Sequence, residues 1–541
     1  MGRHTTSGRI AAGGTDDRRR WLWPLLALSA IALLACAYLV WFTAFRGCGD
    51  RTSVTVVTDP TMSDTVDAVA GAVPDDECYS FHVERIQASD IPSRVTDTEN
   101  APDLWVSDSQ ERSRRILGQI DQTPEYVSES LATTPTVIAG KSVPELDSWV
   151  DVMTLPDLRM GSPVETSTGD SPVVGALTEV QAGKLTQKQL LGALTTLGQQ
   201  QNNARPAFDT DATRLTTAAD GQAPVVTTEQ QFLRFTKLHP NSGLQQSMPA
   251  SGAVLLEFPL VNTARPENRQ KAAEAGALLA AAAASDSGRK ALSDAGFRAA
   301  DGTGVGDPVA PLKLADPDQI DTALQQWQVV SVPMRTIVAL DGSGSMEQAA
   351  GSGTRAQLLS QACLTALQIL PNNAQVGGWL FGVDKGGQGQ DWDEFAPIRR
   401  LDAQDGDQTH RELLGARTKQ AMRTRLGGGT GLYDTTLAAF KAVQKNWDPK
   451  YSNSVIIMTD GANEDPNGIS LDQLLGELKT LQDPARPVIV VTIGISDDAD
   501  TASLKQIAEA TGGTTHVERK ASDIRTVLVD AISARVAAAG R

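Results

Sequence analysis

The amino-acid sequence predicts an α/β protein with an N-terminal transmembrane helix followed by two α/β modules. Three features carry this prediction: a charge-free apolar segment near the N-terminus, strands that alternate with helices over residues 52–300, and fully apolar strands between helices beyond residue 318. Such strands are typical of sheets that helices cover on both faces. The 541 residues can bury two or more cores, and the net charge of −17 argues against nucleic-acid binding, since phosphate contacts need a concentrated positive surface.

The first fifty residues carry a charge opposite to that of the rest of the chain. Six Arg and three Asp give them a net charge of +3, so the remainder carries −20. Residues 21–45 are 25 consecutive residues without a charge, and as a helix they could cross a hydrocarbon core of about 30 Å. Because three Arg directly precede this segment, we expect residues 1–20 to be a basic cytoplasmic tail and the bulk of the chain to lie outside a cell membrane that it crosses once.

Soluble secretion after cleavage and lipidation are the alternatives to an uncleaved anchor. The apolar segment is longer than the about 7–15 residues of a cleaved signal. The sequence before Cys36 resembles a lipoprotein cleavage box, but the chain stays apolar for nine residues after it. Outside the membrane thiols can oxidise, and we expect Cys48 and Cys78, which bracket the first strand and helix, to form a disulfide.

Residues 52–300 form the first predicted module. Strands are expected at 53–58, 78–83, 104–106, 136–139, 224–226 and 253–258 because these runs are rich in β-branched and apolar residues. Helices are expected between them, and an Ala-rich helix should follow from about residue 268 to 284. The alternation predicts a parallel sheet with helices on both faces.

Three segments of this module resemble the bacterial extracellular solute-binding proteins: PDLWVSDS at 102–109, LEFPL at 256–260, and 287–298. The resemblance implies two α/β lobes with a ligand cleft between them. Cleft residues are expected at strand-to-helix junctions, where free backbone N–H groups favour anions; the candidates are Thr61, Ser107, Ser109, Thr168, Ser171 and Thr228. Capping of helices is the alternative role for each. The sequence shows no Arg cluster that would clamp a large anion, so the expected ligand is a small solute, weakly bound or lost.

A linker rich in turn-forming residues is predicted at 301–317, and a second module at 318–541. It begins with a short helix at 318–328. Strands are expected at 336–340, 376–381, 395–401, 454–461 and 487–495, with helices at 355–370, 410–425, up to about 447, and 471–481. Because several of these strands are apolar throughout, the pattern predicts a doubly wound sheet.

Three loops of this module follow predicted strands or helix breaks and carry oxygen-bearing side chains. Asp341, Ser343 and Ser345 form D-x-S-x-S, Thr430 follows three glycines, and Asp460 ends a buried strand. Ligands of open α/β sheets bind at the carboxyl ends of strands. Carboxylate and hydroxyl oxygens suit Mg²⁺ or Mn²⁺. The acids at Asp434 and at 464–465 are expected to be a solvated rim rather than a further cation site.

These five residues resemble the metal-ion-dependent adhesion site of the von Willebrand factor type A domain, which has a Rossmann-like fold. The resemblance implies Ser343, Ser345 and often Thr430 as direct metal ligands, with Asp341 and Asp460 bound directly or through water. It also implies an open metal position that the carboxylate of a protein partner fills.

The leading hypothesis is therefore a membrane-anchored extracytoplasmic binding protein whose type A domain binds a divalent cation and, through it, a protein partner. A solute-binding receptor for a transporter or sensor is the first alternative, and a cell-envelope assembly factor is the second. An enzyme is not expected, because the predicted topology places neither His410 nor His516 beside Ser343 or Ser345, and the chain has neither a nucleophile elbow nor a phosphate loop of the Walker type.

Overall fold

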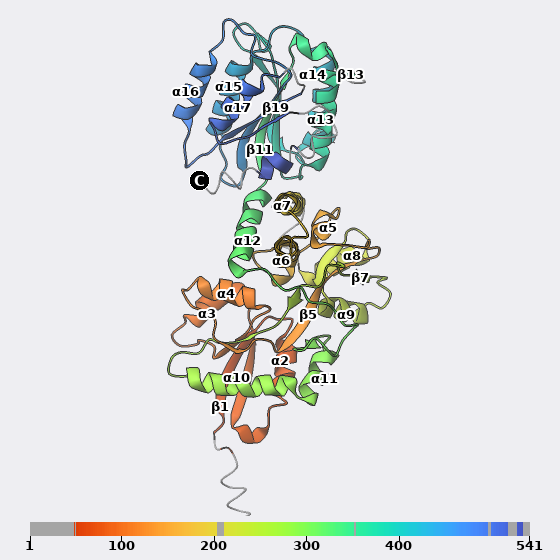
Figure 1. Cartoon of the computed structure of the whole chain (residues 1–541), viewed down its shortest axis with the longest axis vertical. Helices are drawn as coiled ribbons and strands as arrows, with labels where there is room; N and C mark the ends of the chain where they lie inside the picture. Colours follow the sequence, from red (N-terminus) through yellow and green to blue (C-terminus); the bar gives the residue numbers. More distant parts are fainter. Residues whose placement is uncertain are drawn as a thin grey trace, which may run out of the picture.

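The computed structural model describes residues 48, 50–202, 210–350, 353–495, 499–517, 527 and 529–533. The predicted tail at 1–20 and the predicted membrane helix at 21–45 lie outside these residues. Within the described ranges, no helix combines the length and apolar character that a membrane span requires. Figure 1 shows an elongated molecule, with the C-terminal sheet at one end of the long axis and the N-terminal sheet, which includes β1, at the other.

The first lobe is built on a five-stranded sheet in the order β2-β1-β3-β9-β4. Its strands β1, β2 and β3 are parallel, whereas β9 runs antiparallel to β3 and β4. The strands are β1 (Thr52–Thr58), β2 (Tyr79–Arg85), β3 (Leu104–Val106), β4 (Tyr126–Ser128) and β9 (Leu260–Asn262). The helices are α2 (Ser63–Ala70), α3 (Ile91–Val95), α4 (Gln110–Gly118), α10 (Arg269–Ala284) and α11 (Asp286–Asp294), with 3₁₀ turns at Asp75–Glu77 and Ala88–Asp90.

The second lobe is built around one long, fully buried strand, β5 (Ala132–Gly140). All four partner strands run antiparallel to it: β6 (Val225–Thr228), β7 (Gln245–Ser247), β8 (Leu255–Leu256) and β10 (Arg298–Ala299). The helices are α5 (Trp149–Thr154), α6 (Ser167–Gln181), α7 (Gln187–Gln201), α8 (Asp211–Ala219) and α9 (Glu229–Leu238). The expectation of a parallel sheet was therefore wrong for this lobe and holds only for β1, β2 and β3.

The strand predicted at 253–258 is also corrected. Only Leu255 and Leu256 pair as β8, because Phe258 adopts a left-handed backbone with φ of +48° and Pro259 follows it. The backbone turns there and returns to the first lobe as β9. Ala253 instead pairs with Pro311 of the predicted linker.

The segment predicted as a linker lies along the second lobe. Ala253 donates its N–H to Ala310 O at 2.8 Å, and Leu312 donates to Ala253 O at 2.8 Å. The buried Arg298 donates to the carbonyls of Gly302 and Asp307. The chain then forms α12 (Pro317–Ser331), which packs on α6 and α7.

The C-terminal sheet has six strands in the order β15-β14-β11-β18-β19-β20, all neighbours parallel except the edge pair β14 and β15. The strands are β11 (Met334–Asp341), β14 (Gln375–Phe381), β15 (Trp392–Arg400), β18 (Ser452–Thr459), β19 (Ile489–Gly494) and β20 (Thr515–Val517). Helices α13 (Arg355–Ile369) and α14 (His410–Thr424) cover one face, and α15 (Leu432–Lys445), α16 (Leu471–Leu481) and α17 (Thr501–Glu509) the other (Figure 1).

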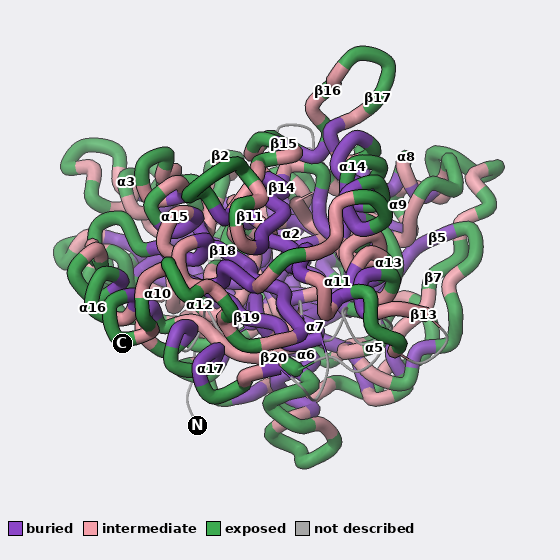
Figure 2. Tube along the Cα trace, turned by 90° about the horizontal axis from the view of Figure 1, so that it is seen from above, coloured by how far each residue is buried: buried purple, intermediate pink, exposed green. Residues whose placement is uncertain are grey.

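Short elements complete this region: a 3₁₀ turn at Gly344–Glu347 and the hairpins of β12 (Ala349–Ala350) with β13 (Gly353–Thr354) and of β16 (Gln404–Asp405) with β17 (Gln408–Thr409). Figure 2 shows buried residues concentrated in β11, β14 and β18, while the β16–β17 hairpin projects into solvent. The carboxyl ends of the buried strands thus form a rigid edge that positions the loops after them.

One apolar core joins the second lobe to the C-terminal sheet. It includes Leu194 and Leu197 of α7, Ile320 and Leu324 of α12, and Val376 of β14, all at most 4% exposed. Polar contacts frame this core: Gln199 donates to Val330 O, and Asn202 donates to Ser331 O. The two modules are therefore packed together through α7 and α12.

Candidate metal centre and interlobe site

Asp341 anchors the first loop of the candidate metal centre. It ends β11, which lies between β14 and β18 in the middle of the sheet, and its side chain is fully buried. One carboxylate oxygen accepts the N–H of Ser343 at 2.8 Å, and the other accepts the hydroxyl of Thr459 at 2.5 Å. Burial raises the pKa of Asp341 to about 6, although the hydrogen bonds from Thr459 and Ser343 oppose that rise. The carboxylate therefore fixes the turn that carries both serines.

Side-chain hydrogen bonds connect this turn to the end of the neighbouring strand β18. Ser343 Oγ lies 2.9 Å from Ser345 Oγ, and Ser345 Oγ donates to Asp460 Oδ1 at 2.7 Å. Asp460 directly follows β18 and is fully buried. Because β11 and β18 are parallel neighbours, their carboxyl ends bring these residues to one edge of the sheet.

The glycine loop before Thr430 closes against the serine turn. Gly427 donates to Gly342 O at 3.0 Å, and Gly344 donates to Gly428 O at 2.9 Å. Gly427 and Gly428 have φ of +123° and +79°, which residues with a side chain rarely adopt. This loop carries Thr430, which is 1% exposed, to the same edge.

Two cationic side chains that the sequence did not single out also belong to this edge. Arg355 Nη1 donates to Asp460 Oδ2 at 2.8 Å, and Lys385 Nζ donates to the carbonyls of Arg425 and Gly427 at 2.8 Å each. Lys385 thereby holds the glycine loop, while Arg355 balances the charge of Asp460. No local pattern pairs Arg355 with a residue 105 positions further on.

The donor set of this edge fits a hard divalent cation. Asp341, Ser343, Ser345, Thr430 and Asp460 offer only carboxylate and hydroxyl oxygens, the ligands that Mg²⁺ and Mn²⁺ prefer. The hydroxyl groups of Ser343 and Ser345 and one oxygen of Asp460 already converge through the contacts given above.

The six residues predicted for the solute cleft have mixed roles. Ser109 and Thr228 cap α4 and α9, and Thr61 bonds to Asp59 in a turn. Ser107 donates to Ser109 O, while Ser171 bonds to Thr136 of β5 and to Ser167 O. Thr168 lies buried in the first turn of α6. Hydrogen bonds link the positions of Ser107, Ser109 and Ser171 through Ser167. Thr228 lies opposite Thr136, the residue that bonds to Ser171, in the pairing of β5 with β6.

The two lobes meet where α4 faces the first turn of α6. Ser109 Oγ lies 2.8 Å from Ser167 Oγ, and Ser167 also donates to Asp108 at 2.9 Å. Arg115 of α4 pairs with Asp170 of α6, and burial raises the pKa of Asp170 to about 6 although this guanidinium opposes the rise.

Arginines stand at this interlobe contact, contrary to the expectation of no Arg cluster. Arg112 is 2% exposed and donates to Val164 O at 3.0 Å, while its Nε and Nη2 atoms are buried without a hydrogen-bond partner. Arg112 and Arg115 are one turn apart on α4. Their i, i+3 spacing, directly after the cap at Ser109, was the signal that could have revealed them.

Cys48 and Cys78 are joined by a disulfide that ties the start of the described chain to the residue before β2. Cys363 is a free cysteine on α13, and burial raises the pKa of its thiol to about 12.

Comparison with known families defines the class of protein. Residues 54–298 match the model of the bacterial extracellular solute-binding protein family, and residues 337–530 match that of the von Willebrand factor type A domain. The chain carries a solute-binding-protein domain followed by a von Willebrand factor type A domain. Both families are usually non-enzymatic.

Individual relatives are known for the whole chain and for each domain. Two proteins of Mycobacterium tuberculosis, "Uncharacterized protein MT1884" of strain CDC 1551 / Oshkosh and "Uncharacterized protein Rv1836c" of strain ATCC 25618 / H37Rv, are each 24% identical over 560 residues, covering 90% of this chain and 79% of theirs. A von Willebrand factor type A structure from Catenulispora acidiphila is 17% identical with a TM-score of 0.29, covering 38% of this chain and 43% of that one. A periplasmic thiamin binding protein is 10% identical with a TM-score of 0.38, covering 52% of this chain and 96% of that one.

Proposed function

We propose that this chain is an extracytoplasmic binding protein, anchored through residues 21–45, that grips a protein partner through a divalent cation. Asp341, Ser343, Ser345, Thr430 and Asp460 would hold Mg²⁺ or Mn²⁺, and the cation would offer a coordination position to a carboxylate of the partner. The observation that carries the proposal is the continuous series of oxygen contacts from Ser343 through Ser345 to Asp460 at the carboxyl edge of the sheet. The match of the first domain to a family of extracellular solute-binding proteins supports the extracytoplasmic location.

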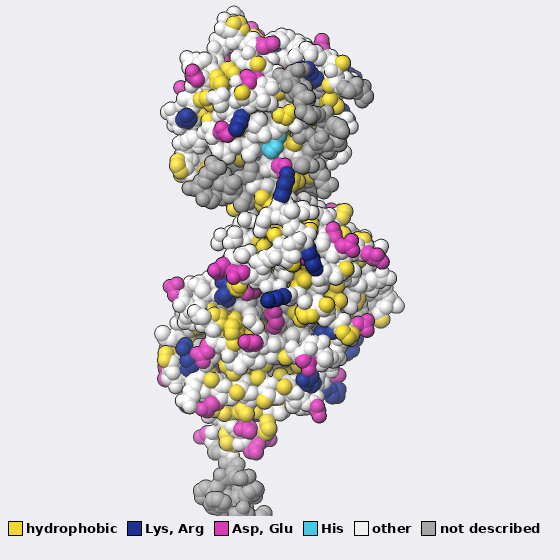
Figure 3. All heavy atoms as spheres, in the orientation of Figure 1, with side chains coloured by type: hydrophobic (Ala, Val, Ile, Leu, Met, Phe, Trp, Pro, Cys, Tyr) yellow, Lys and Arg dark blue, Asp and Glu magenta, His cyan; other side chains and the backbone are white. Residues whose placement is uncertain are grey.

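The surface charge is consistent with a protein partner rather than a nucleic acid. On the face shown in Figure 3, Lys and Arg side chains lie singly among Asp and Glu and form no continuous basic stripe. Binding to the phosphate backbone would need such a stripe.

The metal step is tested with Ser345→Ala in the full chain. Asp341 is a poorer target, because its carboxylate also holds the backbone of Ser343 and the hydroxyl of Thr459. Calorimetric titration with MgCl₂ and MnCl₂ should show saturable binding to the wild type and at least tenfold weaker binding to Ser345→Ala. Ser360→Ala, on α13 of the same domain, is the matched control and should bind like the wild type. Equal affinity in all three proteins would refute the site.

The partner step is tested separately. Wild type and Ser345→Ala are immobilised and exposed to extracytoplasmic protein fractions with MgCl₂ or with EDTA. The proposal expects a bound protein that is lost both with EDTA and in the variant. If the chain binds the metal but captures no protein in an EDTA-sensitive way, the proposed metal centre stands and the proposed binding of a protein partner is refuted.

We propose solute binding between the lobes as a second function, because Arg112 is buried there with an Nη2 atom that has no hydrogen-bond partner and an Nε atom whose nearest acid, Asp108, is 4.0 Å away. Because Arg115 one turn away already pairs with Asp170, Arg112 is the group expected to bind a small anion. Oxyanions and carboxylates should raise the melting temperature of the full chain, and Arg112→Gln should abolish that rise. An unchanged melting temperature across the panel would count against a working cleft.

A further inference from the structure

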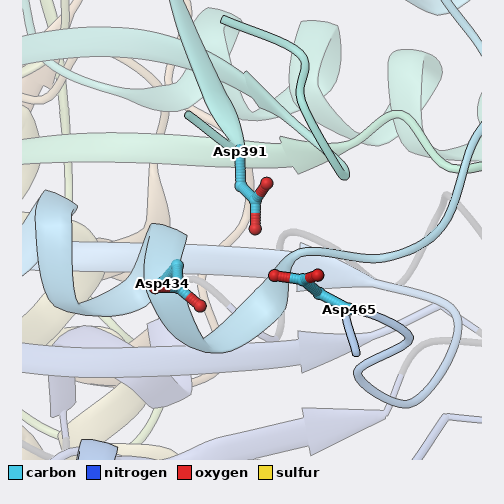
Figure 4. A group of neighbouring side chains, drawn as sticks. All are labelled: Asp391, Asp434 and Asp465. Atoms are coloured by element: carbon cyan, nitrogen blue, oxygen red, sulfur yellow. The ribbon is translucent and has the colours of Figure 1, made fainter. Parts of the chain in front are cut away.

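Three aspartates, two on loops and one in the first turn of a helix, meet beside the glycine loop of the type A domain, apart from the five residues of the proposed metal centre. Asp391 precedes β15, Asp434 lies in the first turn of α15, and Asp465 lies between β18 and α16. One carboxylate oxygen of each lies within 4.8 Å of the other two. Figure 4 shows the three carboxylates, Asp434 from a helix and the other two from loops, directed toward one another.

Asp391 is the buried member of this group, and its charge is incompletely satisfied. The residue is 6% exposed. Its Oδ1 accepts the N–H of Asp384 at 3.0 Å, but its Oδ2 is buried and has no hydrogen-bond partner in the described chain. A buried carboxylate oxygen without a donor is costly, so this oxygen calls for a positive ligand.

Basic side chains do not fill that role. Among the described residues, none of the three aspartates forms an ion pair with Lys, Arg or His. Asp434 Oδ2 accepts the N–H of Ile469 and Asp465 Oδ1 accepts the N–H of Asn467, both at 2.9 Å. Three negative charges thus lie close together with only backbone donors around them.

Two glycines bring the backbone against the carboxylates. A Cβ atom at Gly431 would lie 2.2 Å from Asp391 Oδ2, and one at Gly468 would lie 2.2 Å from Asp434 Oδ2 and 2.3 Å from Asp465 Oδ2. Any side chain at either position would enter the space between the acids. The loops are therefore shaped to keep that space free.

We propose that Asp391, Asp434 and Asp465 bind a calcium ion, distinct from the cation proposed at Asp341. The donors are oxygens only, and they come from two loops and the first turn of α15. Ca²⁺ accepts such flexible, oxygen-rich coordination, whereas Mg²⁺ demands a near-octahedral set. The ion would neutralise the unpartnered Oδ2 of Asp391 and tie together the loops that carry Thr430 and Asp460, since Gly431 follows Thr430 directly and Asp465 lies on the loop after Asp460.

The test uses full-length protein in a Ser345→Ala background, which weakens the other proposed cation site at least tenfold. Calorimetric titration with CaCl₂ should show one saturable site, and CaCl₂ should raise the melting temperature relative to EDTA. Adding Asp465→Asn should weaken Ca²⁺ binding at least tenfold and abolish the thermal shift. In EDTA, Asp465→Asn should melt no lower than its parent, because it relieves repulsion between like charges. Asp391→Asn, which keeps the acceptor for Asp384, is the second variant and should behave in the same way.

Asp483→Asn in the same background is the matched control, since Asp483 is an acid of the same domain that pairs with Arg486 at the surface. It should leave Ca²⁺ binding unchanged. Absence of saturable Ca²⁺ binding in the parent would overturn the proposal. It would also be overturned by equal affinity in both Asn variants, or by an equal loss in the Asp483→Asn control.

Discussion

Replacing Arg355 with methionine tests how the proposed metal centre balances its charge. Arg355 Nη1 lies 2.8 Å from Asp460 Oδ2, and the two side chains are 9% and 0% exposed. Removing one partner of a buried ion pair costs about 3–5 kcal/mol, because the other charge stays buried. Ser345 still donates to Asp460, so we expect a loss of about 3 kcal/mol in the free energy of unfolding without metal.

The same substitution should strengthen metal binding. The guanidinium and a divalent cation would both act on the carboxylate of Asp460, and like charges at that distance repel each other. Without Arg355 the cation alone neutralises Asp460. We expect the Mg²⁺ affinity to rise roughly tenfold, about 1.4 kcal/mol, and the Mg²⁺-induced rise in melting temperature to exceed that of the wild type.

The assay compares melting temperatures in EDTA and in MgCl₂, with calorimetry for the affinity. Arg298→Met is the matched control, because Arg298 forms a two-bond ion pair with Glu229 in the second lobe and both side chains are at most 3% exposed. It should destabilise the chain at least as much, because Arg298 also donates to the carbonyls of Gly302 and Asp307, but without any Mg²⁺ dependence. A Mg²⁺ shift in Arg355→Met that is equal to or smaller than that of the wild type would refute the reasoning.

Three further predictions concern the first domain. Burial raises the pKa of Glu257 to about 7. Its contribution to the free energy of unfolding is therefore greatest below pH 4.5 and falls by up to about 3 kcal/mol as the pH rises to 7. In Glu257→Gln the melting temperature should change less with pH between pH 5 and 8, and it should be higher than that of the wild type at pH 8. Replacing Cys48 and Cys78 with Ser should cost about 3–4 kcal/mol, measured by non-reducing denaturation, and an unchanged midpoint would show that the disulfide constrains little. Gly175→Ala would place a Cβ 2.3 Å from the ring of Trp149 and should lower stability by about 1–3 kcal/mol; a neutral effect would mean that the ring moves freely.

Elements with a strong local signal were predictable from the sequence. The helix predicted at 471–481 is α16 with the same bounds, because Ser470 and Gln473 form a capping box at its start. The apolar run of β18 is a central strand because both its faces are covered by helices. The pairing of β5 was not predictable, because its four antiparallel partners come from distant parts of the chain.

The candidate sites divide in the same way. Asp341 and Asp460 were expected to lie together because both follow buried strands, and the structure places them at one edge. Arg355 and Asp391 were missed, because each lies on a loop or helix start with no pattern that links it to its spatial neighbours. Asp434 was expected to be part of a solvated rim. The buried Asp391 beside it makes the three aspartates a candidate cation site instead.

The continuous core through α7 and α12 has a consequence for how the molecule would bear tension. α12 ends at Ser331 and β11 begins at Met334, so the helix continues almost directly into the strand whose far end is Asp341. Figure 1 shows that the C-terminal sheet containing β11 occupies the opposite end of the long axis from β1. If the chain is held by its N-terminus and a partner by the metal edge, a pull between them passes through packed helices rather than a slack tether. The molecule would then act as a stiff arm that holds its partner at a fixed distance from the membrane.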